Sequence, residues 1–72
     1  MEETWERSIE VCGEVFELLF IRRPFREGLE VHVTVHGTAI RLAELGLGER
    51  ALIERATARI EEELQDRKGP KA

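Results

Sequence analysis

The spacing of hydrophobic and polar residues changes near the middle of the chain. From Leu29 to His36 an apolar residue at every second position alternates with a polar one. From about residue 49 to 67 the apolar residues instead recur every three or four positions. Alternation is typical of a strand with one buried face, and the longer period is typical of an amphipathic helix. We therefore predict a strand over 29–36 and a long helix over about 49–67.

Two further strands are predicted before this point. Residues 4–11 alternate in polarity, and Gly13 can adopt the positive φ that a tight turn requires. Residues 15–21 are rich in aromatic and β-branched side chains, which favour strands. This second strand is apolar on both faces, with Phe16, Leu18 and Phe20 on one and Val15, Leu19 and Ile21 on the other.

Residues 38–45 allow two interpretations. Thr38 can cap a short helix, and Gly46 permits a left-handed exit from it. Ile40 and Leu42 also alternate with polar or small residues, as in a strand, and periodicity alone does not decide so short a segment. We predict the short helix. The resulting fold class is α+β, a three-stranded antiparallel meander followed by a short helix and a long C-terminal helix on one sheet face.

The long helix has a clear apolar side. Ile53, Ala56, Thr57, Ile60 and Leu64 gather on it, with Leu52 at its flank. Arg59 with Glu63, and Glu63 with Arg67, have the i,i+4 spacing of helical ion pairs. Gly69 and Pro70 are a stop signal. We therefore predict one domain over residues 1–72, in which 69–72 form a frayed tail.

Composition points to a cytoplasmic protein. Cys12 is the only cysteine, and the acidic N-terminal residues do not resemble a secretory leader. The longest apolar run, residues 18–21, is far shorter than the ~20 residues of a membrane span, so we expect no membrane partner. Asn and Tyr are absent, and nearly all cations are arginine, a composition that suits a thermophilic or GC-rich source.

A net charge of −4 disfavours general binding of nucleic acid, because such binding depends mostly on Lys and Arg. A local site remains conceivable at the turn after the second strand. Arg22, Arg23, Phe25 and Arg26 can supply guanidinium groups for phosphates and a ring for base stacking. A helix-turn-helix over residues 38–60 is disfavoured, because Glu49 and Glu54 would stand at the start of its second helix.

The candidate chemistry for an enzyme is sparse. Cys12 paired with His32 or His36 is the one nucleophilic arrangement that the strands allow, and no sequence neighbour would activate the thiol. His32 and His36 lie roughly 13 Å apart along one strand, too far for one metal ion. The only serine and the only aspartate, Ser8 and Asp66, fall in the first strand and the end of the helix. We predict no catalytic residues, no metal site, no cofactor and no enzymatic activity.

The second strand carries the main functional expectation. A single helix covers one face of a sheet, so Val15, Leu19 and Ile21 need another cover. A second copy of the chain is the common solution, and the N-terminus or the 38–45 segment folded back over the strip is the alternative. We therefore expect a non-enzymatic homodimeric interaction or regulatory module, with a further protein partner possible. The alternative function is a nucleic-acid-binding domain that uses the 22–26 loop.

Overall fold

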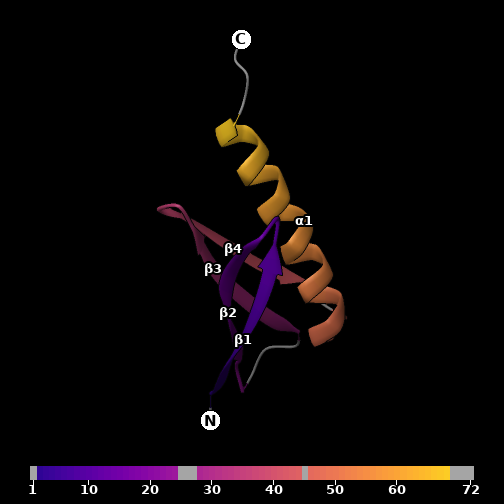
Figure 1. Ribbon diagram of the computed structural model, residues 1–72. Helices are drawn as coiled ribbons and strands as arrows, with labels where there is room; N and C mark the ends of the chain where they lie inside the picture. Colours follow the sequence, from indigo (N-terminus) through magenta and orange to yellow (C-terminus); the bar gives the residue numbers. More distant parts are fainter. Residues whose placement is uncertain (1, 25–27, 45, 69–72) are drawn as a thin grey trace.

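The computed structural model describes residues 2–24, 28–44 and 46–68 (Figure 1). It contains four strands and one helix in these ranges: β1 (Glu3–Val11), β2 (Glu14–Arg22), β3 (Leu29–Val35), β4 (Thr38–Glu44) and α1 (Glu49–Lys68). The strands form one antiparallel sheet in the order β1-β2-β3-β4. The predicted α+β class and C-terminal helix are therefore confirmed.

The predicted short helix after the third strand is wrong. Residues 38–44 form β4, which pairs with β3 over its whole length, from Val35↔Thr38 to Leu29↔Glu44. The sheet has four strands rather than three, and the described residues form one helix rather than two. The alternation of Ile40 and Leu42 was therefore the better guide, since both side chains face the core from β4.

Two tight turns explain why the chain continues as strand. Cys12 and Gly13, between β1 and β2, have φ values of 54° and 81°, and His36 and Gly37, between β3 and β4, have 48° and 88°. Positive φ at both central residues is the signature of a type I′ turn, whose twist matches that of the paired strands. The second turn thus directs residues 38–44 back along β3. His36, predicted as the last residue of a strand, belongs to this turn instead.

The helix buries a row of residues at four-residue spacing. Leu52, Ala56 and Ile60 are fully buried, so Leu52 lies at the centre of the apolar side rather than at its flank. α1 packs mainly against β3 and β1. The buried core consists of Val11, Phe16, Leu18, Phe20, Leu29, Val31, Val33, Val35, Ile40, Leu52, Ala56 and Ile60.

Polar contacts hold the start of α1 and one pair lies along it. The Leu52 amide donates to the Gly48 carbonyl at 3.1 Å, which closes the first turn. Arg7 Nε donates to Glu49 Oε2 at 2.6 Å and ties β1 to the start of α1. The predicted Arg59–Glu63 pair is present at 3.7 Å.

Two remaining expectations concern the end of the chain and the membrane. The predicted Glu63–Arg67 pair and the 69–72 tail lie outside what the structure describes. Among the described residues, no helix combines the length and apolarity needed to cross a membrane.

Candidate functional site

One face of the sheet is covered by α1, and we call the other the open face. Strand alternation and register place the following side chains on it: Thr4, Glu6, Ser8 and Glu10 from β1; Val15, Glu17, Leu19 and Ile21 from β2; Glu30, His32 and Thr34 from β3; and Ala39, Arg41 and Ala43 from β4. The three residues predicted as an interface therefore share one strand and one face.

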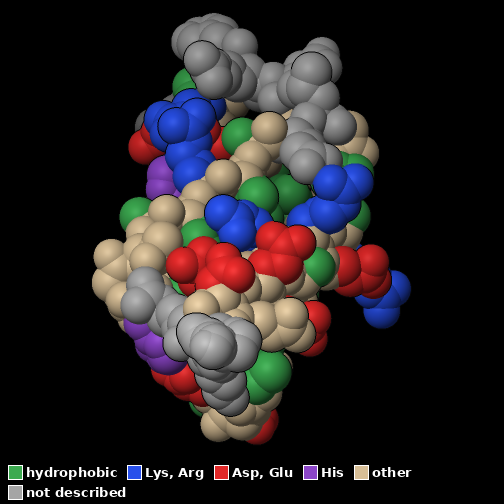
Figure 2. Space-filling model, turned by 90° about the horizontal axis from the view of Figure 1, so that it is seen from above, with side chains coloured by type: hydrophobic (Ala, Val, Ile, Leu, Met, Phe, Trp, Pro, Cys, Tyr) green, Lys and Arg blue, Asp and Glu red, His purple; other side chains and the backbone are tan. Residues whose placement is uncertain are grey.

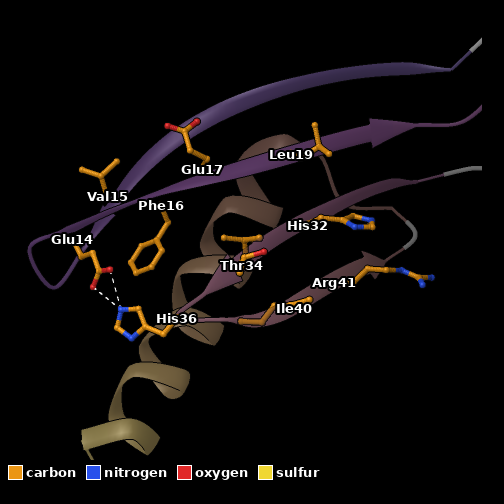
Figure 3. Close-up of a pocket in the computed structure, with 12 residues that line it drawn as sticks. Glu14, Val15, Phe16, Glu17, Leu19, His32, Thr34, His36, Ile40 and Arg41 are labelled. Carbon is orange, nitrogen blue, oxygen red and sulfur yellow. Dashed lines mark hydrogen bonds and ion pairs between the residues drawn. The ribbon is translucent and has the colours of Figure 1, made fainter.

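The apolar strip on β2 is accessible in the monomer. Val15 is 62% exposed and is the one large hydrophobic side chain so exposed in the described part of the chain. Leu19 and Ile21 are half-buried. Figure 3 shows Val15 and Leu19 pointing away from α1, whereas Phe16 points to the other side of β2. No described segment folds back over the strip, because residues 2–4 continue the line of β1 and residues 38–44 lie within the sheet.

A hollow of about 700 Å³ lies beside this strip. The ladder between β2 and β3 covers only the pairs from Leu19↔His32 to Ile21↔Glu30, and the hollow lies beyond it, toward the start of β2. Its lining includes the core residues Phe16, Val33 and Ile40. At its edge His36 Nε2 lies 2.9 Å from Glu14 Oε2, which connects the β3–β4 turn to β2 (Figure 3).

A buried carboxylate organises the other end of the open face. Glu30 is 8% exposed. Its Oε1 accepts hydrogen bonds from Arg23 Nε at 3.1 Å and Arg23 Nη2 at 2.8 Å, and its Oε2 lies 3.4 Å from Arg41 Nε. These hydrogen bonds from Arg23, assisted by the charge of Arg41, hold the pKa of Glu30 below its ordinary value despite burial. Glu30 therefore stays charged and positions both arginines.

His32 lies next to this cluster with an unsatisfied nitrogen. Its Nε2 is buried and has no hydrogen-bond partner among the residues that the structure describes, and it lies 3.8 Å from Glu30 Oε1. Arg23, Glu30, His32 and Arg41 together line a shallow hollow of about 300 Å³. A buried polar atom without a hydrogen-bond partner costs free energy.

The Glu30 cluster makes stability depend on pH. Because the pKa of Glu30 is lower when folded than when unfolded, the charged group stabilises the fold above its ordinary pKa of 4.5. This contribution is lost as the pH falls through the folded value. We expect Glu30→Gln to lower the free energy of unfolding by about 1–2 kcal/mol at neutral pH and to flatten its decline in acid. Denaturation series from neutral to acidic pH measure the loss at neutral pH and the decline in acid. Glu61→Gln, at an exposed position of α1, is the control. An unchanged acid slope in Glu30→Gln would contradict this assignment.

The arginines proposed for nucleic-acid binding are already paired within the chain. Arg22 Nη1 lies 3.3 Å from Glu3 Oε1, and the Arg22 guanidinium stacks over Trp5. Arg23 Nη1 lies 2.7 Å from Glu2 Oε2, in addition to its bonds to Glu30. In the view of Figure 2, acidic and basic side chains likewise lie next to one another. Phe25 and Arg26 fall outside the described residues. Paired guanidinium groups offer less charge to phosphates, so these contacts argue against the nucleic-acid alternative.

The residues considered for catalysis are spread over the fold. Cys12 is exposed in the β1–β2 turn, Ser8 donates to Glu17 at 2.9 Å, and His36 is held by Glu14. Three or more His, Cys, Asp or Glu side chains do not come together as metal ligands anywhere in the described ranges. The structure thus brings together Val15, Leu19 and Ile21 on one face of β2, whereas Cys12 lies on a different element from His32 and from His36.

Comparison with known proteins adds no further assignment. Searches against protein-family models, curated proteins and solved structures find no match to this chain. The function must therefore be argued from the geometry of the open face.

Proposed function

We propose that this protein is a non-enzymatic homodimeric interaction or regulatory module, and that its open face binds a second copy of the chain. The observation that supports the proposal is the accessible apolar strip Val15, Leu19 and Ile21 on the face opposite α1. Polar side chains flank it on β1 and β3. An apolar centre with a polar rim is the usual composition of a protein interface.

Size supports the same proposal. A chain of 72 residues buries only about 60% of the surface that its unfolded form exposes, so it gains much from additional burial. The two intramolecular covers considered from the sequence were the N-terminus and the 38–45 segment. Residues 3–11 form β1 and residues 38–44 form β4. A symmetric partner would cover the strip. The single exposed thiol, Cys12, suits the reducing cytoplasm, where we place the protein.

Leu19→Glu tests the proposal. Leu19 is at the centre of the strip, and a carboxylate there would have to be desolvated in the interface without a partner. We expect the dimer dissociation constant to rise by about 100-fold or more, measured by sedimentation equilibrium on the wild type and the variant. Ala58→Glu, at an exposed position of α1, is the matched control and should leave the dimer unchanged.

Two results would contradict the proposal. A wild-type protein that stays monomeric at high micromolar concentration excludes the homodimer. A wild-type dimer that Leu19→Glu leaves equally tight excludes the open face and points instead to an edge strand such as β4, whose outer side is unpaired in the sheet order.

A further inference from the structure

One cross-strand row of the open face carries opposite charges at its two ends. The strand register pairs Glu6 with Leu19, Leu19 with His32, and His32 with Arg41. The row therefore reads acid, leucine, histidine, arginine from β1 to β4. Glu6 is exposed, and the Arg41 side chain is 63% exposed although its Nε approaches Glu30. Both end groups are thus available to a partner.

The rest of the face follows the same division. Glu6, Glu10 and Glu17 place three carboxylates on β1 and β2. On β3 and β4 the one carboxylate, Glu30, is already compensated by Arg23 and Arg41. The β1–β2 half is therefore acidic, and the β3–β4 half presents the free end of Arg41 and the His32 ring.

Two copies can stack face to face in two simple ways, and the division of charge between the two halves of the face favours one of them. A two-fold axis running across the strands would place β1 on β1 and bring the acidic halves together. An axis parallel to the strands, passing between β2 and β3, places β1 of one copy over β4 of the other. Sheets that pack face to face keep their strands within about 30° of each other, which this arrangement allows.

The parallel axis makes the charged row complementary to itself. Glu6 then lies over Arg41 of the partner subunit, and Leu19 lies over His32 of the partner subunit. The neighbouring row, in which Thr4, Ile21, Glu30 and Ala43 are paired in turn, places Thr4 over Ala43 of the partner subunit. Neither row brings like charges together, and such an arrangement is favoured because like charges across an interface cost several kcal/mol.

We propose that two copies of this protein associate through their open faces about a two-fold axis parallel to the strands, with Glu6 of each copy paired to Arg41 of the other. The pairing rests on the proposed function, because it specifies the geometry of the same homodimer. The pairing also uses the Glu30 cluster. Glu30 contacts Nε of Arg41, so the terminal nitrogens of Arg41 stay available to the partner's carboxylate.

Charge reversal tests the pairing. Glu6→Arg alone places two arginines at each contact, and Arg41→Glu alone places two glutamates there. We expect each variant to dimerise at least tenfold more weakly than the wild type. An equimolar mixture restores an opposite pair at both contacts of a heterodimer, so we expect it to associate with nearly wild-type affinity. Native mass spectrometry resolves heterodimer from homodimers, and exposed Glu54→Arg on α1 is the control for the charge change.

A neutral pair of variants guards against loss of folding in Arg41→Glu, which removes a contact to Glu30. Glu6→Gln and Arg41→Gln should each weaken the dimer, and the double variant should weaken it no more than either alone. The pairing would be overturned if the mixture associates no better than either charge-reversal variant alone. It would also be overturned if the losses of affinity in Glu6→Gln and Arg41→Gln add up in the double variant. If Leu19→Glu still dissociates the wild-type dimer in that case, the open face stands and only its symmetry is wrong; a monomeric wild type overturns both.

Discussion

Replacing Phe20 with alanine is expected to lower the free energy of unfolding by about 3–5 kcal/mol. Phe20 is fully buried, and its ring stacks on Trp5 with 5.6 Å between centroids. Alanine leaves a cavity in the centre of the sheet and removes this stack. At about 0.05–0.15 kcal/mol per residue, the 72 residues have a total stability of about 4–11 kcal/mol. The substitution therefore removes a large part of it.

Urea denaturation of the Phe20 variants measures this loss. Phe20→Leu is the matched control, because leucine keeps most of the volume and should cost less than half as much. Protein concentration must be the same in every series, since dimerisation raises apparent stability by mass action. Equal losses for alanine and leucine would show that the Phe20 ring is not closely packed.

Leu52→Ala is expected to lower the free energy of unfolding by about 2–5 kcal/mol, because it empties a fully buried position of α1. Leu52 is fully buried, whereas Leu64, later on the same helix, is only partly buried. Leu64→Ala makes the same chemical change at a site that solvent partly fills, so we expect a loss of about 1 kcal/mol. Thermal or urea unfolding followed by circular dichroism compares the two. A larger loss of unfolding free energy in Leu64→Ala than in Leu52→Ala would contradict this expectation.

Alternation predicted the first and third strands, aromatic and β-branched composition predicted the second, and helical spacing predicted the long helix. They did not place residues 38–44. Ala39, Leu42 and Ala43 are good helix formers, and their strand state is imposed by the turn at His36 and Gly37 together with pairing to β3. A His-Gly pair between two alternating runs is the signal that could have identified the hairpin.

The candidate site was predictable in its apolar part only. Val15, Leu19 and Ile21 could be grouped because they alternate along one strand. The burial of Glu30 could not be predicted, since it depends on Arg23, which directly follows β2, and on Arg41 from β4, and these residues are far apart in the sequence. The Glu14–His36 contact likewise joins the first residue of β2 to the β3–β4 turn. Such contacts follow from strand register. The register could not be worked out while residues 38–45 were predicted as a helix.

The single thiol has a position that makes it a marker of dimer polarity. Cys12 lies exposed at the tip of the β1–β2 turn, at one extremity of the strands. Rotation about an axis parallel to the strands keeps that tip at the same end of the assembly, so the two sulfurs of a dimer lie at the same end. Rotation about the crossing axis sends them to opposite ends, separated by the length of the sheet. Spin labels or a short bifunctional crosslinker on the native cysteine therefore distinguish the two symmetries without any substitution in the protein.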